Sequence, residues 1–220
     1  MSRNAKQTIP YAQQQLTQAI TQLKQGGPRE EILPMLETVL SQLQTLATHD
    51  HLTGALNRRA LIARLESELE RSLRTGHTFT FAVIGIDRLP EIMEQHGQDA
   101  TKRVLQVVTL EAGRMLRTLD SFGRIAATEF AIVMPTTWLD QSLKAIHRLQ
   151  SCITAVDWNS ITPGETISFC TGLTPNSPGD TAELMLARAS AALIQAKAKG
   201  PGGIAQQETE LPDFDPSSAD

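Results

Sequence analysis

The sequence predicts an α+β fold, in which a mixed β-sheet is flanked by helices and preceded by an N-terminal α-helical hairpin. Apolar residues at helical spacing alternate along the chain with short apolar runs that are typical of buried strands. Two of these runs lie only a few residues apart, which indicates an antiparallel β-hairpin. The predicted order after the helical hairpin is α, β, α, β, β, α, β, α, and we expect the helices to pack largely on one face of the sheet.

Residues 1–48 are predicted to form the two helices of the hairpin, separated by Gly26-Gly27-Pro28. Apolar residues recur at every third or fourth position of the second helix and form a narrow seam that suits a partner helix. The hairpin is therefore either a lid that packs within the chain or a dimerising segment that makes the protein a homodimer. The seam consists of Ile32, Leu36, Leu40, Leu43 and Ala47.

Residues 49–204 are predicted to form the sheet domain. Residues 205–220 contain acids, prolines and serines without periodicity, so we expect a disordered acidic tail. Within the domain we expect helices at about 57–75, 98–116, 139–156 and 181–199, strands at 79–87 and 166–173, and a β-hairpin at 121–135.

Composition excludes several classes of function. The net charge of −4 and the aromatic content of 4% argue against a nucleic-acid partner. No apolar run is long enough to span a membrane and the first residues are polar, so we expect a cytoplasmic protein. Cys152 and Cys170 have no companions at zinc-ligand spacing, and we expect both to be reduced.

The segment from His49 to about Ile204 resembles the GGDEF domains, whose active members are diguanylate cyclases that join two GTP molecules into cyclic di-GMP. The opening DHLTGALNRR (50–59) is similar to the family motif D-x-L-T-G-L-x-N-R-R at seven specified positions. RIAATEFAIVMP (124–135) resembles the hairpin that names the family, and ASAALIQAKAKG (189–200) resembles its closing motif. The resemblance implies a sheet related to nucleotide-cyclase and polymerase-palm domains, and a role in cyclic di-GMP signalling.

The resemblance also implies where catalysis would occur, and the key acids are replaced. Attack of a 3′-hydroxyl on an α-phosphorus needs a divalent metal, which carboxylate oxygens hold. The family places one acid at the end of its first strand and one at the third position of the turn, and these positions are Gly85 and Thr128 here. No catalytic residues and no cofactor are therefore expected, and Mg²⁺ would bind only with residual cyclase activity or GTP binding.

Other nucleotide contacts of the family are replaced in the same way. The two glycines of its turn are alanines here, whose Cβ atoms would obstruct a nucleotide and penalise a positive φ. Lys197 remains as a phosphate-contact remnant. The replaced positions are Ala126 and Ala127 in the turn, Met93 and Lys102 for guanine, and Pro90 and Pro201 for phosphate.

Two acids survive close to these positions, Asp87 and Glu129. Glu129 stands where the family places a candidate general base, and strand alternation puts Asp87 on the same face as position 85. The two acids either form a residual metal site or have structural roles. In the structural alternative, Asp87 caps the next segment and Glu129 makes an ion pair.

One set of ligand-binding residues of the family is retained. Arg117-Thr-Leu-Asp120 resembles the R-x-x-D inhibitory site at which cyclic di-GMP binds to active members, and Arg148 falls where the family places a second arginine. Arginine can fork onto guanine or phosphate, and a carboxylate can accept from guanine N–H groups. The alternative is an i,i+3 ion pair between Arg117 and Asp120 on a helix end.

These observations predict a catalytically inactive GGDEF protein that acts as a cyclic di-GMP receptor. Two other functions remain open. The first is a protein–protein scaffold whose nucleotide sites are vestigial, and the second is a weak diguanylate cyclase or GTP-binding regulator. A protein partner is expected for the receptor and for the scaffold.

Overall fold

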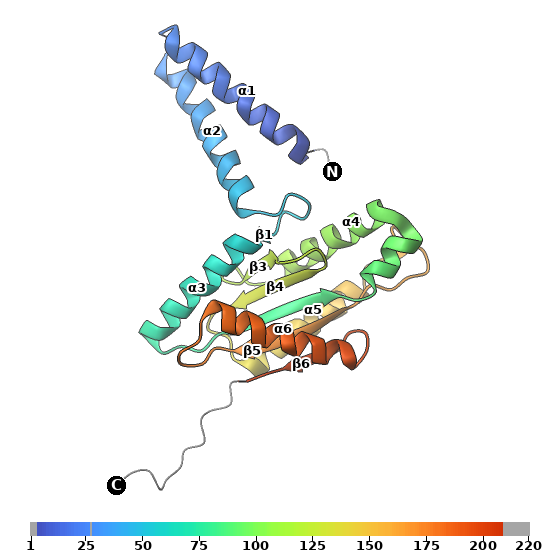
Figure 1. The fold of residues 1–220 in the computed structure, drawn as a ribbon. Helices are drawn as coiled ribbons and strands as arrows, with labels where there is room; N and C mark the ends of the chain where they lie inside the picture. The colour runs from blue at the N-terminus through green and yellow to red at the C-terminus, as the bar shows by residue number, and fades with distance from the viewer. Residues whose placement is uncertain (1–3, 27, 209–220) are drawn as a thin grey trace, which may run out of the picture.

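A computed structural model describes residues 4–26 and 28–208, and Figure 1 shows a sheet domain from which a helical hairpin projects. The hairpin consists of α1 (Asn4–Lys24) and α2 (Arg29–Thr48). α1 and α2 pack against each other, and their contact with the domain is mainly between α2 and the first helix of the domain. The expectation of a lid folded over the domain is therefore wrong, because the hairpin stands clear of the sheet.

The sheet domain contains six strands in the order β1-β3-β4-β2-β5-β6. The central strand β2 pairs antiparallel with both β4 and β5, whereas the short edge strands β1 and β6 pair parallel with β3 and β5. The sheet is therefore mixed, as predicted. Its strands are β1 (Leu56–Asn57), β2 (Thr80–Ile86), β3 (Ser121–Arg124), β4 (Glu129–Met134), β5 (Phe169–Pro175) and β6 (Ile204–Gln206), and its helices are α3 (Arg58–Thr75), α4 (Leu89–Met115), α5 (Leu139–Thr154) and α6 (Ala182–Ala198).

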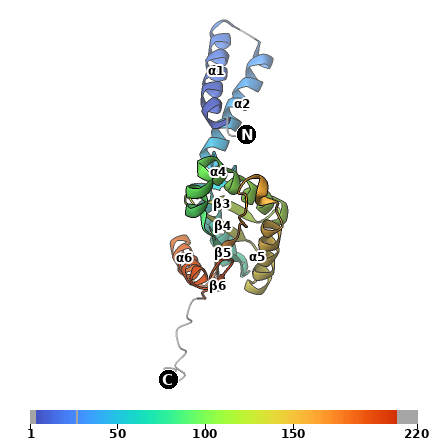
Figure 2. The same ribbon diagram turned by 90° about the vertical axis from the view of Figure 1, so that its right-hand side faces the viewer.

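Helices cover both faces of the sheet, so the expectation that they pack largely on one face is wrong. Figure 2 shows α6 and α5 on opposite sides of the strands. All seven residues of β2 are buried. Phe81 and Val83 pack with α3 and α6, whereas Ala82 and Ile84 pack with α4 and α5. The sheet therefore separates two apolar cores.

Several element boundaries differ from the predicted ones. α4 begins at Leu89 rather than near residue 98, and Gly97, with a φ of 80°, interrupts its helical geometry. β5 begins three residues later than predicted, because residues 166–168 precede its ladder with β2. The strands β1 and β6 were not predicted at all. β6 crosses the predicted boundary at residue 204, and residues 209–220 of the predicted tail lie outside the described residues.

The base of the hairpin is fastened to the sheet domain by polar contacts. The side chains of Asn57 and Arg59 both donate to the carbonyl oxygen of Ala47, at 3.0 and 2.9 Å. Arg124 donates to Asp50 at 3.2 Å and to the carbonyl oxygen of Ala127 at 2.6 Å. A series of contacts therefore leads from the end of α2 to the β3–β4 turn.

Asp50, the first residue of the DHLTGALNRR segment, is ionised in this arrangement. Burial alone would raise its pKa, but hydrogen bonds from the backbone and hydroxyl of Thr53 and the charge of Arg124 lower the pKa. Asp50 therefore stabilises the segment as a carboxylate.

Among the described residues, no helix has the length and apolar character needed to cross a membrane.

Candidate functional site

The positions that would hold a metal lie where β2 and β4 meet. Gly85 is paired with Glu129 across the two strands, and Thr128 precedes Glu129 at the end of the turn. The backbone N–H of Ile86 donates to the carbonyl oxygen of Thr128 at 3.3 Å. The fold thus brings the predicted catalytic positions together, but without the two acids of the family.

Lys197 of α6 occupies the space beside Gly85. A Cβ atom at Gly85 would lie 2.9 Å from Cε and 3.1 Å from Nζ of Lys197. The same ammonium group forms an ion pair with Glu129 at 3.5 Å. One of the two surviving acids therefore already has a cationic partner on α6.

The second surviving acid, Asp87, also has partners. Its Oδ2 atom accepts hydrogen bonds from the hydroxyl of Ser168 at 2.6 Å and from the backbone N–H of Gly202 at 2.8 Å. Asp87 therefore ties the end of β2 to the residues that precede β5 and β6. The expectation that it caps the next segment is wrong, since Arg88 is the N-cap residue of α4 and makes no side-chain capping bond.

These residues do not fit a divalent metal. In the described part of the chain, no three His, Cys, Asp or Glu side chains are grouped so that they could hold a metal ion. Gly85 supplies no ligand, and both surviving acids have protein partners. No chemical step that requires a metal follows from this geometry.

The β3–β4 turn accommodates its alanines without backbone strain. Ala126 and Ala127 are exposed, and neither adopts a positive φ. The N–H groups of Ile125 and Ala126 both donate to the carbonyl oxygen of Glu129, at 2.9 and 3.2 Å. The expected penalty for alanine therefore does not arise, and the consequence of the replacement is limited to the added Cβ atoms.

The positions that correspond to guanine recognition lie on α4. Met93 is 44% exposed, and its sulfur lies 3.8 Å from the hydroxyl of Thr101. The ammonium of Lys102 is paired with Asp99 at 3.2 Å and with Gln98 at 3.3 Å. Neither side chain reproduces the amide or carboxylate of the family.

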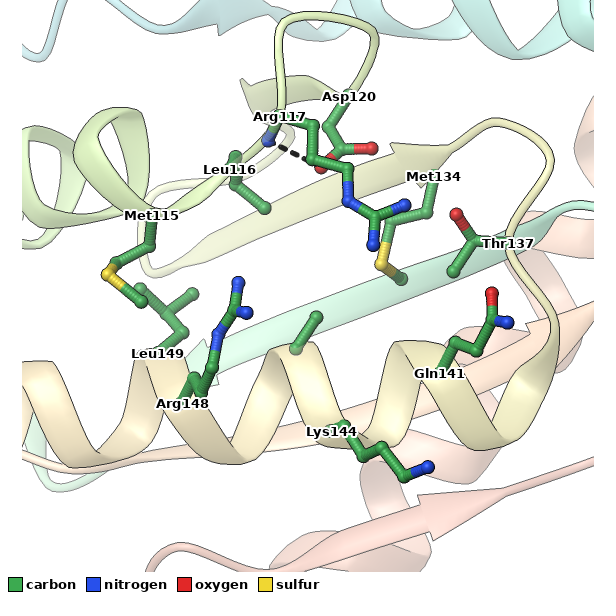
Figure 3. A pocket seen from close by; sticks show the side chains of 11 residues that line it. Met115, Leu116, Arg117, Asp120, Met134, Thr137, Gln141, Lys144, Arg148 and Leu149 are labelled. Carbon is green, nitrogen blue, oxygen red and sulfur yellow. Dashed lines mark hydrogen bonds between the residues drawn. The ribbon is translucent and has the colours of Figure 1, made fainter.

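A second region, which we call the two-arginine hollow, lies between the α4–β3 loop and α5 (Figure 3). Its volume is about 370 Å³. Arg117 and Asp120 come from the loop, and Arg148 comes from α5. The remaining lining residues are Met115, Leu116, Met134, Thr137, Gln141, Lys144, Ala145 and Leu149.

The loop holds Asp120 by backbone contacts. α4 ends at Met115, so Arg117 and Asp120 lie in a turn beyond the helix. The N–H of Arg117 donates to Oδ2 of Asp120 at 2.8 Å, and the N–H of Asp120 donates to the carbonyl oxygen of Arg117 at 3.0 Å. The alternative of a side-chain ion pair on a helix end is wrong, because the backbone of Arg117, and not its guanidinium, binds the carboxylate.

Both guanidinium groups of the hollow are available for a ligand. Arg117 and Arg148 are exposed, and neither guanidinium forms a salt bridge or a hydrogen bond with any described residue. In Figure 3 Arg117 extends from the loop toward α5, and Arg148 rises from α5 into the same space. Two guanidinium groups and one carboxylate, from the α4–β3 loop and from α5, therefore face the same hollow.

The environment of Asp120 also affects its protonation. Burial raises the pKa of Asp120, and this effect outweighs the hydrogen bond from the N–H of Arg117 and the attraction of its charge. The carboxylate is thus more readily protonated than an ordinary aspartate. A donor from a ligand would favour its ionised form.

Sequence reasoning placed Arg117, Asp120 and Arg148 but missed the rest of the hollow. Gln141 and Lys144 precede Arg148 by seven and four residues on α5, so helical periodicity could have found them. In Figure 3 Gln141 points toward the hollow, whereas Lys144 points away from it. No periodicity in the sequence predicts the ion pair between Lys197 and Glu129, because the two residues lie on distant elements, α6 and β4.

Comparisons with known proteins agree with this architecture. The family model described as "Diguanylate cyclase, GGDEF domain" matches residues 47–202. The chain is 32% identical to the diguanylate cyclase DgcP of Pseudomonas aeruginosa over 154 residues, which are 70% of this chain and 23% of DgcP. It is 29% identical to the response regulator PleD of Caulobacter vibrioides over 180 residues, which are 80% of this chain and 39% of PleD. The chain thus spans less than half the length of these curated relatives.

Solved structures share the fold. The coiled coil and GGDEF domain of DgcB from Caulobacter crescentus, in complex with c-di-GMP, superposes with a TM-score of 0.74 at 21% identity, over 80% of this chain and 93% of that one. The diguanylate cyclase SiaD of Pseudomonas aeruginosa, in complex with its activator SiaC, gives a TM-score of 0.70 at 25% identity, over 93% of this chain and 78% of SiaD. The match to the family model, which covers well over half of the residues, shows that the chain belongs to the GGDEF family of diguanylate cyclase domains.

Proposed function

We propose that this protein is a catalytically inactive member of the GGDEF family that binds cyclic di-GMP in the two-arginine hollow and acts as a receptor. The observation that carries the proposal is that one carboxylate and two guanidinium groups, which have no partners among the described residues, line the same hollow. Cyclic di-GMP offers two phosphates, which attract guanidinium groups, and guanine edges. Guanine presents acceptors to an arginine fork and N–H donors to a carboxylate.

Catalytic inactivity is the second part of the proposal. An active cyclase would need a metal beside the triphosphate. Here the ammonium of Lys197 lies beside Gly85 and pairs with Glu129. We therefore expect no cyclic di-GMP above background from GTP with Mg²⁺ or Mn²⁺. A product that disappears in Glu129→Ala would overturn this part and favour a weak cyclase.

Calorimetric titration with cyclic di-GMP tests the receptor role. Loss of a charge-assisted arginine contact costs about 1.5–3 kcal/mol, so Arg117→Ala and Arg148→Ala should each weaken binding about tenfold to a hundredfold. Arg114→Ala is the matched control, because Arg114 precedes the hollow on the same helix end and pairs with Glu111. It should leave the affinity unchanged.

Two results would contradict the receptor role. The first is the absence of binding at about 100 micromolar cyclic di-GMP, a concentration at which even a weak specific complex would form. The second is binding that is equally strong in the wild type, Arg117→Ala and Arg148→Ala. Either result would favour the scaffold function.

A protein partner and self-association complete the proposal. SiaD, which resembles this chain over its helices and its domain, is in complex with an activator protein. The hairpin of this chain stands clear of the domain and exposes apolar side chains. We therefore propose that α1 and α2 mediate association, and that the protein is a homodimer.

A further inference from the structure

Trp138 presents an aromatic ring to solvent beside the two-arginine hollow. It is 61% exposed, and no other Phe, Tyr or Trp side chain that the structure describes is exposed. Trp138 is the N-cap residue of α5 and directly follows Thr137, which lines the hollow. A large apolar ring in water is unfavourable, and exposed tryptophans are typical of surfaces that contact a ligand or a partner.

Helical spacing places Trp138 in the row of α5 residues that line the hollow. Gln141, Ala145 and Arg148 follow Trp138 by three, seven and ten residues, and residues at these intervals share one side of a helix. Because each residue advances a helix by about 1.5 Å, Gln141 lies about 10 Å along the axis from Arg148, and Trp138 lies about 5 Å farther. In Figure 3 Gln141 and Thr137 accordingly lie at the end of the hollow that is far from Arg148.

The loop that precedes Trp138 is held in an unfavourable conformation. Thr136 has a φ of 48°, in the left-handed region that β-branched residues rarely adopt, and such residues cluster at ligand sites. The hydroxyl of Thr137 donates to the carbonyl oxygen of Pro135 at 2.8 Å, and the hydroxyl of Thr80 donates to the carbonyl oxygen of Thr137 at 2.9 Å. The backbone before Trp138 is therefore fixed, so less conformational entropy is lost when the ring contacts a ligand.

Gln141 provides polar groups next to this ring. It is exposed and points toward the hollow, and its amide has no hydrogen-bond partner among the described residues. An amide both donates and accepts, so it can pair with adenine as well as with guanine. The ionised carboxylate of Asp120 only accepts, so it matches the N–H groups of guanine and repels the ring nitrogen that adenine presents at the same position. The two ends of the hollow therefore differ in selectivity.

The volume of the hollow leaves room for only part of a cyclic dinucleotide. A volume of about 370 Å³ is near the lower end of the range of about 300–1,000 Å³ for pockets that enclose a drug-sized ligand. Two purines, two riboses and two phosphates form a larger molecule. One base must therefore lie at the edge of the hollow, where Trp138 is exposed.

We propose that Trp138 and Gln141 form a purine subsite, in which the indole ring stacks on one base of a cyclic dinucleotide while Asp120 binds the other base as guanine. This inference rests on the proposed receptor function and adds the selectivity of its site. Stacking tolerates different bases, because every base has a π face. The site therefore requires one guanine and accepts either guanine or adenine as the second base.

Tryptophan fluorescence of the full chain, titrated with cyclic di-GMP, tests the stacking directly. The chain contains two tryptophans, and Trp158 is 3% exposed, with its indole N–H donating to the carbonyl oxygen of Ile153 at 2.9 Å. Because Trp158 is shielded, quenching by the ligand reports on Trp138. The wild type should be quenched with the same midpoint as in calorimetry, and Trp138→Phe should show no quenching.

Calorimetry of Trp138 variants measures the contribution of the ring. Trp138→Ala should weaken cyclic di-GMP binding about fivefold to a hundredfold, the magnitude of stacking between a base and an aromatic side chain. Trp138→Phe keeps an aromatic ring and should retain most of the affinity. The matched control is Leu184→Ala, since Leu184 is 54% exposed but lies on α6, across the sheet from α5. It should leave the affinity unchanged, and circular dichroism should show the same helix content in all three variants.

Two further cyclic dinucleotides test the selectivity. The mixed ligand with one guanine and one adenine should bind within about threefold of cyclic di-GMP, because the purine subsite accepts the adenine. Cyclic di-AMP should bind at least about tenfold more weakly than the mixed ligand, because neither of its bases offers the N–H donors of guanine to Asp120.

Two results would overturn the purine subsite alone. The first is cyclic di-GMP binding that depends on Arg117 and Arg148 but is equally strong in the wild type and Trp138→Ala, which would favour a protein contact for the exposed ring. The second is a mixed ligand that binds as weakly as cyclic di-AMP. Absence of cyclic di-GMP binding in the wild type would instead overturn the receptor function together with the subsite.

Discussion

Replacement of Asp87 by alanine should destabilise the domain far more than replacement of Glu129. Oδ2 of Asp87 accepts two hydrogen bonds, from Ser168 at 2.6 Å and from Gly202 at 2.8 Å. A hydrogen bond to a charged group contributes about 1.5–3 kcal/mol, and partial exposure of Asp87 places the total for the pair at about 2–4 kcal/mol. In a domain of this size, that loss lowers Tm by roughly 5–15 °C.

The same reasoning predicts a small effect for Glu129→Ala. Its ion pair with Lys197 has a distance of 3.5 Å, and the two side chains are 30% and 46% exposed. Such a pair contributes about 0.2–1 kcal/mol, which corresponds to a change in Tm of about 1–3 °C. Half-molar salt should remove the effect of Glu129→Ala and leave that of Asp87→Ala, because salt screens exposed pairs.

Differential scanning calorimetry of both variants, with and without Mg²⁺ or Mn²⁺, measures these effects. Asp87→Asn is the control, since an amide oxygen can still accept one of the hydrogen bonds. Equal losses in Asp87→Ala and Glu129→Ala would refute the reasoning from the contacts. A metal-induced rise in the Tm of the wild type that both variants abolish would show that the two acids form a metal site.

Three further predictions follow from the charged and titratable groups. Affinity for cyclic di-GMP should fall as the pH decreases through the raised pKa of Asp120, above the range of an ordinary aspartate, and Asp120→Asn should flatten this dependence in calorimetry. Burial raises the pKa of Cys170 to about 11, so at pH 8 Ellman's reagent should react with Cys152 and reach Cys170 only after unfolding. Asp180→Asn should destabilise the domain by about 3–5 kcal/mol in chemical denaturation, because the bidentate partner Arg188 is only 13% exposed.

The helices with strong periodicity were predictable from the sequence, and the shortest elements were not. Leucines at every fourth residue predicted the helix at 58–75 closely. The first half of α4 was missed because Pro90 and Gly97 interrupt the pattern, although the chain remains helical on both sides of Gly97. β1 and β6 contain two and three residues, too few to show alternation, and only their pairing partners define them.

The distribution of helices over the two faces was present in the sequence but was misinterpreted. The β2 segment is apolar at nearly every position, which is typical of a strand buried on both faces. A strand with helices on only one face would alternate between apolar and polar residues. The composition of β2 therefore predicts a sheet between two helical layers, as the structure shows.

The residues of the two-arginine hollow were easier to predict from the sequence than the contacts around Gly85. The spacing of Arg117, Asp120 and Arg148 identified three residues of the hollow, but not that both guanidinium groups lack partners in the part of the chain that the structure describes. The position of Lys197 beside Gly85 depends on how α6 packs against β2, which no local pattern records. Contacts between distant elements are thus the part of the site that only the structure supplies.

The contacts of Arg124 have a consequence for the transmission of motion. Arg124 binds Asp50 at the foot of the hairpin and the carbonyl oxygen of Ala127 in the β3–β4 turn. Its side chain is only 15% exposed, so neighbouring atoms restrict its rotamers. A torque applied to the hairpin by a bound partner would reach the turn through this side chain and through β1, whose Asn57 binds Ala47 and pairs with Arg124 of β3. By thermodynamic reciprocity, any contact made by the turn would also bias the orientation of the hairpin.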